Sequence, residues 1–203
     1  MLNEKEIGVA TPKKLNAFEA SIDDAIRVLT SLKALERDLE QAAAYCISSL
    51  KNGHKLLVCG NGGSATEAQH LVGELVGRYK SDRIAWPALA LSADSAVVTC
   101  IANDFSYEDV FARQVQAFGK PGDILVAFST SGQSKNVLKA LEAARKLQLT
   151  SIAFFGRNVQ SSSSLAECTL HVPHSDTARI QEGHQFLMHS LMDLIEAGIA
   201  GGS

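Results

Sequence analysis

The sequence predicts an α/β protein with a central parallel sheet covered by helices on both faces, a three-layer sandwich. Two observations support this fold class. Short apolar runs alternate with helical stretches along the chain, and two of these runs end in loops rich in glycine or serine that open a further helix. Such alternation gives parallel strands joined by right-handed crossovers. No linker or internal repeat divides the chain, so we expect one domain over residues 1–203.

Residues 1–52 are predicted to form a helical region. Apolar residues recur at three- and four-residue steps from Leu15 to Leu50, which indicates two amphipathic helices. These helices present more apolar surface than one face of a sheet needs for cover. We therefore expect the region to take part in oligomer assembly.

The remaining elements follow from apolar runs bounded by turn residues. Strands are expected at Lys55–Gly60, Ala88–Ser92, Asp123–Phe128, Thr150–Phe155 and Cys168–Val172. Helices are expected after the loop Gly60–Ser64, at Ser95–Ala102 and Tyr107–Phe118, up to Gln148, and at Asp176–Ala200. The serine tract 161–164 is interpreted as a flexible surface loop.

Composition excludes several classes of partner. The 19 basic and 22 acidic residues give a formal charge of -3, and aromatic residues make up 6% of the chain, which disfavours binding of nucleic acid. No apolar run approaches the length of a membrane span, and the N-terminal segment lacks the pattern of a signal peptide. The four cysteines include no CxxC pair, so we expect free thiols and a cytoplasmic protein.

Two loops at the ends of predicted strands are candidate phosphate-binding loops. The first, Gly60–Ser64, contains three glycines and lets a ligand approach the backbone. The second, Ser129–Ser134, carries hydroxyl groups that donate hydrogen bonds to phosphate oxygens at the start of a helix. The first loop also fits the GxGxxA pattern of dinucleotide sites. A dinucleotide site needs an acidic residue at the end of the second strand. Asp82 instead precedes the second predicted strand, so binding of a compact monophosphate is favoured.

Two segments carry candidate metal ligands or acid–base groups. His70 and Glu74 stand four residues apart, which places both side chains on one face of a helix. The same spacing is compatible with an ordinary surface pair. In the closing helix, His184 is interpreted as a histidine that is either hydrogen-bonded or exposed, and His189 lies five residues further on.

Several segments, taken in order, form a pattern that spans most of the chain. They are Cys59–Ser64, Ala68–His70, Glu74–Leu75, Ile101–Asp104, Phe111–Val115, Ser129–Gly132 and Ala178–Glu182. This pattern resembles the phosphoheptose isomerases, which are sedoheptulose 7-phosphate isomerases of the sugar-isomerase (SIS) domain superfamily. The resemblance implies the flavodoxin-like SIS sandwich, a homotetramer, and conversion of sedoheptulose 7-phosphate to D-glycero-D-manno-heptose 7-phosphate on the route to bacterial heptose for lipopolysaccharide or capsule.

The resemblance also implies roles for individual residues. The metal ligands, usually read as a zinc site, are His70, Glu74, Gln181 and His189. The two proton-transfer residues are Glu74 and His189. The substrate-binding residues are Asn61, Gly62, Gly63, Glu74, Asn103, Asp104, Ser129, Thr130, Ser131, Ser134 and Gln181.

Isomerisation through an enediol requires these types of residue. One group takes a proton from carbon and returns it, and a second moves protons between the two oxygens. We assign the first role to Glu74 and the second to His189, beside a cation that stabilises the enediolate. Gln181 and His189 are separated by about 12 Å of helical rise. Either Gln181 lies at or before the helix start, or the site combines two subunits.

Two other functions compete with this one. The first is a non-catalytic SIS binding module of the kind that associates with a bacterial replication initiator. That branch lacks the glutamate and the final histidine, whereas Glu74 and His189 are both present. The second is an SIS isomerase that acts on another phosphosugar, such as a hexose or pentose phosphate.

Overall fold

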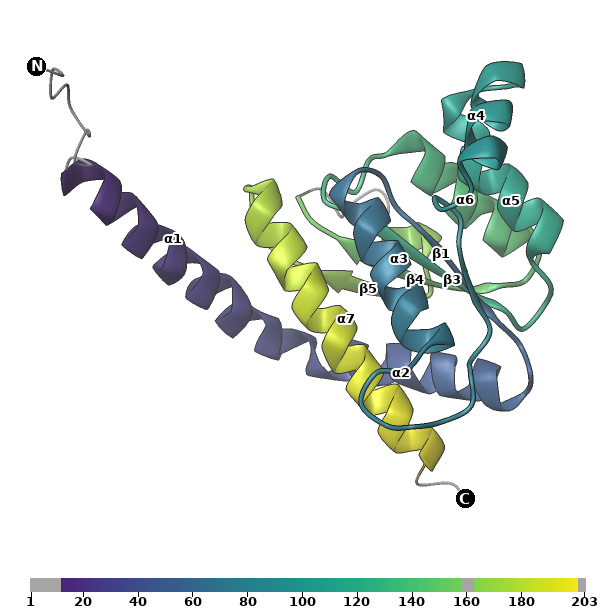
Figure 1. Cartoon of the computed structure of the whole chain (residues 1–203), viewed down its shortest axis with the longest axis horizontal. Coiled ribbons are helices and arrows are strands. Elements are labelled where there is room, and N and C mark those ends of the chain that lie inside the picture. The colour runs from purple at the N-terminus through teal and green to yellow at the C-terminus, as the bar shows by residue number, and fades with distance from the viewer. Residues whose placement is uncertain (1–11, 158–162, 201–203) are drawn as a thin grey trace, which may run out of the picture.

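The computed structural model describes residues 12–157 and 163–200, and its centre is a five-stranded parallel sheet of order β2-β1-β3-β4-β5. The strands are β1 (Leu56–Cys59), β2 (Ala88–Ala90), β3 (Ile124–Ser129), β4 (Thr150–Phe155) and β5 (Cys168–His171). Helices cover both faces of this sheet (Figure 1). The predicted fold class is therefore confirmed.

Seven α-helices are described around the sheet. They are α1 (Pro12–Ser31), α2 (Glu36–Lys51), α3 (Gly63–Val76), α4 (Ser95–Asp104), α5 (Val110–Phe118), α6 (Lys135–Lys146) and α7 (Thr177–Ala200). Single 3-10 turns stand at η1 (Leu32–Leu35), η2 (Tyr107–Asp109) and η3 (Ser163–Leu165). The stretch predicted as one helix from Tyr107 to Phe118 is thus a 3-10 turn followed by α5.

The two faces of the sheet bury separate apolar clusters. In β3, Ile124, Val126 and Phe128 point into a cluster with α2, α3 and α7. Leu125 and Ala127 point to the opposite face and pack against α5 and α6. Because successive side chains of a strand alternate between faces, a strand buried on both sides must be apolar at every position.

The sheet order places a topological switch point between β1 and β3. β1 pairs with β2 on one side and with β3 on the other. After β1 the chain continues to β2 at one edge of the sheet, and after β3 it continues through β4 to β5 at the opposite edge. Ligands of open α/β sheets bind at the carboxyl ends of the strands beside such a switch point. The loops that follow β1 and β3 are the two loops singled out by the sequence.

The N-terminal region contains the two predicted helices, joined by the turn η1. The first half of α1 extends away from the sheet, whereas α2 packs beneath it (Figure 1). Two contacts fasten α1 to the start of α7 and to the segment before it. His174 Nε2, in that segment, lies 3.3 Å from Asp24 Oδ2, and Arg179 Nη1, in the first turn of α7, donates to the carbonyl of Ser21 at 2.8 Å.

Two further sequence predictions are tested by the described residues. Within the serine tract, Ser163 and Ser164 belong to the turn η3, while residues 161 and 162 lie outside the described part of the chain. No helix among residues 12–157 and 163–200 is long and apolar enough to span a membrane.

Candidate active site

The glycine loop after β1 is shorter than the sequence indicates, because α3 already begins at Gly63. Gly62, which precedes α3, has a φ of +56°, a conformation that glycine adopts without strain. A Cβ on Gly63 would collide with Nε2 of Gln181 on α7. The absence of a side chain at Gly63 therefore lets Gln181 lie against the first turn of α3.

Asn61 connects this loop to the serine loop. Its Nδ2 donates to Oδ1 of Asn136 at 2.9 Å, and Nδ2 of Asn136 donates back to its Oδ1 at 2.8 Å. The hydroxyl of Tyr107 donates to the same Asn61 oxygen at 2.9 Å. Asn136 is buried in the first turn of α6, so the two loops are held to each other by a fixed amide pair.

The hydroxyl groups of the serine loop converge. Oγ of Ser129 lies 3.4 Å from Oγ of Ser131 and 3.1 Å from Oγ of Ser134, and it accepts a hydrogen bond from the backbone of Gly132. The loop stands immediately before α6, where a helix N-terminus favours an anion. The arrangement is suited to the oxygens of one phosphate group.

The lysines next to the serine loop are already paired with carboxylates. Lys135 lies 2.9 Å from Glu108, and Lys139 lies 3.3 Å from Glu108 and 2.9 Å from Asp109. The pKa of Glu108 is lowered, chiefly by its hydrogen bonds to these two lysines. A phosphate in the loop would therefore rely on hydroxyl and backbone donors.

Asn103 and Asp104, expected to contact substrate, are exposed at the end of α4. Nδ2 of Asn103 donates to Oδ1 of Asp104 at 2.8 Å, and the thiol of Cys100 lies 3.5 Å from the other carboxylate oxygen. Their described side-chain hydrogen bonds stay within this group. Tyr107, which the sequence did not single out, is the residue of this segment that reaches the glycine loop.

The candidate metal ligands come together between α3 and α7. His70, Glu74 and His189 each offer one ligand atom, and these atoms lie within 4.8 Å of one another. Nε2 of His70 lies 2.9 Å from Oε1 of Glu74. Gln185, one turn before His189, places its Nε2 3.0 Å from His70 Nδ1 and 3.1 Å from His189 Nε2. Sequence reasoning missed Gln185, although its four-residue spacing from both Gln181 and His189 was visible.

The donor set of this cluster fits a divalent cation. Two imidazoles and one carboxylate are the ligands of many catalytic zinc sites, which leave a further position for water or substrate. His70 is exposed and Glu74 and His189 are half-buried, so the cluster is open to solvent on one side. The ring of Tyr79 stacks on that of His189 at 5.8 Å between centroids and restrains its orientation.

Arg83 fixes the end of α3 that carries Glu74. Its guanidinium donates to the backbone carbonyls of Glu74 and Leu75 at 2.5 and 2.9 Å. The same group contacts Glu196 at 3.2 Å and lies 3.6 Å from the centroid of the Trp86 ring. Arg83 thus donates to carbonyls that would otherwise lack a partner at the C-terminus of the helix. By holding the backbone of Glu74, it also limits movement of the Glu74 carboxylate.

Gln181 lies inside α7, so the first of the two alternatives left open by the sequence, a position at or before the helix start, is wrong. Its side chain lies over Gly63, two turns before His189. In one chain, Gln181 therefore borders the glycine loop, whereas Gln185 reaches the histidines. Both line a hollow of about 400 Å³ together with Gly63, Thr66, Glu67 and Glu182. This hollow extends from the glycine loop toward the histidine–glutamate cluster.

His184 differs from the sequence interpretation. It is completely buried, and no described residue lies within hydrogen-bonding distance of either ring nitrogen. Its surroundings are the rings of Phe128 and Phe154, with centroids at 6.0 Å, and the carboxylate of Glu67 at 3.8 Å. It is therefore not exposed, and it forms no hydrogen bond with the part of the chain that the structure describes.

Comparison with known proteins places this architecture in a defined class. A family model described as the SIS domain matches residues 21–156. The phosphoheptose isomerase of Akkermansia muciniphila is 45% identical over 172 residues, which are 85% of this chain and 91% of that protein. That of Helicobacter pylori is 48% identical over 170 residues, 84% and 88% of the two chains. The structure of the phosphoheptose isomerase from Neisseria gonorrhoeae matches with a TM-score of 0.85 and 37% identity, covering 90% of this chain and 98% of that one.

The fold and the two loops at the switch point define a protein of the SIS class. Within that class, the chain belongs to the phosphoheptose isomerase family, and it is an isomerase. The resemblance found in the sequence is thereby confirmed, and the non-catalytic binding module is not favoured.

Proposed function

We propose that the protein interconverts sedoheptulose 7-phosphate and D-glycero-D-manno-heptose 7-phosphate for bacterial heptose synthesis. The observation that carries this proposal is the convergence of His70, Glu74 and His189. Gln185 contacts both histidines and lines a hollow that reaches Gly63 of the glycine loop. Family membership supports the substrate class, because the relatives are named for this activity.

The phosphate is assigned to the serine loop. Ser129, Ser131 and Ser134 supply hydroxyl donors, and the N-terminus of α6 supplies a favourable dipole. Binding energy at the phosphate fixes the register of the sugar along the hollow, so that the carbonyl end reaches α7. The Asn61–Asn136 pair keeps the two loops at a constant separation.

The proton transfers are assigned to Glu74 and His189. The Glu74 carboxylate takes the proton from the carbon beside the carbonyl and returns it to the neighbouring carbon. The imidazole of His189 moves protons between the two oxygens of the enediol. Arg83 holds the backbone of Glu74, and the Tyr79 ring stacks on that of His189.

His70, Glu74 and His189 would hold a divalent cation, for which we propose zinc, and Gln181 is the fourth ligand implied by the family pattern. When bound, such a cation supplies Lewis-acid stabilisation of negative charge on the substrate oxygens. The three described ligand atoms lie close enough to meet at one ion. Holding the two histidines in position is a role for Gln185, which contacts both rings.

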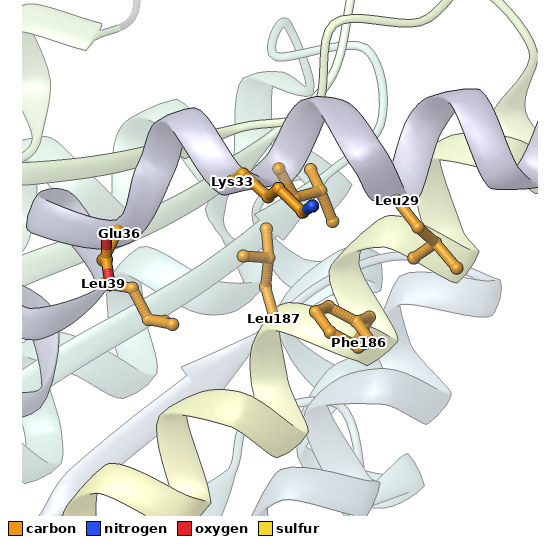
Figure 2. A pocket seen from close by; sticks show the side chains of 7 residues that line it. Leu29, Lys33, Glu36, Leu39, Phe186 and Leu187 are labelled. Atoms are coloured by element: carbon orange, nitrogen blue, oxygen red, sulfur yellow. The ribbon is translucent and has the colours of Figure 1, made fainter.

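We also propose that α1 mediates assembly into a homo-oligomer, as a tetramer. Phe18, Ile22 and Ile26 lie on one face of α1 and are 71%, 45% and 56% exposed. Next to this surface, a largely apolar groove of about 440 Å³ lies between α7 on one side and the end of α1, η1 and the start of α2 on the other (Figure 2). In Figure 2, Phe186 and Leu187 of α7 point toward the helix that carries Leu29. Exposed apolar patches of this kind mark protein–protein interfaces.

The cysteines support a reducing compartment, for which we propose the cytoplasm. Cys46, Cys59 and Cys168 are buried and unbonded, and burial raises the pKa of the Cys46 and Cys59 thiols to about 12. Such thiols stay protonated and unreactive at neutral pH.

The direct test is to incubate the purified protein with sedoheptulose 7-phosphate and to follow formation of the aldose, with and without a chelator. We expect turnover that depends on a divalent cation. Absence of turnover with metal present would contradict the proposal. Faster conversion of a hexose or pentose phosphate would favour the other phosphosugar isomerases.

A further inference from the structure

Glu67 and His184 form a polar pair in the wall of the hollow between α3 and α7. Glu67 is 7% exposed and lines the hollow together with Gln181 and Gln185. His184 stands behind it, with Nδ1 3.8 Å from Oε2 of Glu67. Nothing in the assignment of the phosphate, the metal ligands or the proton-transfer residues uses either side chain.

Both groups have unused hydrogen-bonding capacity. Among the described residues, no partner is within hydrogen-bonding distance of Glu67 Oε2 or of either nitrogen of His184. Buried polar atoms are almost always hydrogen-bonded, and leaving one without a partner is unfavourable. Oε2 is buried and faces His184, whereas the Glu67 side chain as a whole lines the hollow, so its carboxylate is placed to accept a hydrogen bond from a ligand there.

The position of Glu67 indicates what the donor is. It follows Gly63 by one turn of α3 and precedes His70 by about one turn, so it lies between the loop end and the metal end of the hollow. A phosphosugar that spans this distance presents the hydroxyls of its middle carbons here. Carboxylate oxygens accept such hydroxyl hydrogens strongly.

We propose that Glu67 is a substrate-binding residue that accepts a hydrogen bond from a hydroxyl of the sugar chain, and that His184 is the positioning residue that holds its carboxylate toward the hollow. The packing of His184 against Phe128 and Phe154 fixes its ring and gives Glu67 a rigid backing. This inference rests on the proposed function only for the chemical class of the ligand, a polyol phosphate.

The test separates binding of the sugar chain from binding of the phosphate and from catalysis. Titration calorimetry would use two probes: heptitol 7-phosphate, which has no carbonyl and is not isomerised, and inorganic phosphate. We expect Glu67→Gln to weaken heptitol 7-phosphate binding about tenfold to a hundredfold, because a hydrogen bond to a charged group is lost. Its affinity for inorganic phosphate should change by less than about twofold, since that probe does not reach Glu67.

Two further variants separate an effect on binding from an effect on folding. His184→Phe preserves an aromatic ring against Phe128 and Phe154, and it should weaken heptitol 7-phosphate binding several-fold while thermal unfolding remains cooperative. Glu142→Gln makes the same charge change on α6, across the sheet, and serves as the control.

Equal loss of affinity for both probes, or unchanged heptitol 7-phosphate binding in a folded Glu67→Gln protein, would overturn the inference. A wild type that binds heptitol 7-phosphate no better than phosphate would overturn it as well. Failure of the proposed isomerisation is a separate result, because it appears as absent turnover of sedoheptulose 7-phosphate by a wild type that still binds the heptitol.

Discussion

Asn61 and Asn136, far apart in sequence, are joined by reciprocal amide hydrogen bonds of 2.9 and 2.8 Å. The amide oxygen of Asn136 also accepts from the backbone of Val137 at 3.0 Å, so its orientation is fixed by its own helix. One buried side chain thus sets the spacing between the glycine loop and the serine loop.

Replacing Asn136 by alanine should weaken phosphate binding. The change removes both amide hydrogen bonds. Among the described residues, the Asn61 side chain then keeps the Tyr107 contact alone, so the glycine loop loses its fixed distance from the serine loop. We expect the KM for sedoheptulose 7-phosphate to rise about tenfold and the free energy of unfolding to fall by about 1–3 kcal/mol. Steady-state kinetics and urea denaturation measure the two effects. Asn52→Ala, at an exposed helix end, is the control, and an equal rise in its KM would contradict the explanation.

The roles assigned within the cluster predict separate effects of changes at Glu74 and at His70. Glu74→Gln keeps the shape of the side chain but removes the base, so kcat should fall by about 10²–10⁴-fold. His70→Ala should lose bound metal, measured by elemental analysis of the purified protein, together with its activity. Activity of Glu74→Gln at the wild-type level would show that another residue removes the proton.

The close contact between Gly63 and Gln181 predicts a specific effect of Gly63→Ala. The new Cβ must displace the Gln181 amide, which is the flexible end of its side chain, so the fold should survive. A misplacement of about 1 Å can lower activity by about 10²-fold, and we expect kcat/KM to fall by up to that factor. Gly62→Ala is the matched control: it meets no neighbouring atom but adopts a strained φ, so it should lower stability more than catalysis. If Gly63→Ala retains full kcat/KM, the position of Gln181 is unimportant for turnover.

Asp123 predicts how stability responds to acid. Burial alone would raise the pKa of this carboxyl, but hydrogen bonds from Lys55 and from the backbone of Lys120 outweigh burial and lower it. Because the folded pKa lies below the ordinary value of 3.8, the ionised group stabilises the fold above that pH, and the contribution is lost as pH falls through the folded pKa.

We therefore expect Asp123→Asn to destabilise the protein by about 2 kcal/mol at pH 7, and by less in acid as the wild-type carboxyl becomes protonated below its lowered pKa. Thermal unfolding of both proteins over a series of acidic pH values gives the comparison. A difference that does not shrink in acid would assign the effect to packing and not to charge.

The proposed assembly through the exposed face of α1 predicts that charged substitutions on this face dissociate the oligomer. A double variant, Ile22→Glu and Ile26→Glu, places carboxylates at two exposed apolar positions that face away from the sheet cluster. Light scattering should then report a smaller particle, while circular dichroism stays unchanged. Activity of this dissociated form decides between a site within one chain and a site shared by two; an unaltered particle size would place the interface elsewhere.

The fold was predictable because its signal is local. Each strand is a short apolar run, and the two-sided burial of β3 requires such a run regardless of its partners. Boundaries were less predictable: α3 begins at Gly63 because the backbone of Ser64 already bonds to the carbonyl of Asn61 at 3.0 Å.

The candidate site could be predicted only at residues whose side-chain type itself indicates a chemical role. His70, Glu74 and His189 are conspicuous as a donor set, and their family pattern points to them. Tyr107 and Asn136 act through contacts between distant segments, which a single sequence does not display. The burial of His184 was not predictable either, because it depends on how α7 packs against Phe128 and Phe154.

The two contacts that fasten α1 to the start of α7 would couple association through α1 to ligand binding beside α7. Arg179, which holds the backbone of Ser21, lies two residues before Gln181 in the first turns of α7. A second copy of the chain bound to α1, as proposed above, would therefore restrain the helix that borders the hollow. By thermodynamic reciprocity, the factor by which association tightens ligand binding is the factor by which ligand tightens association. Substrate should accordingly act as a measurable effector of the quaternary state.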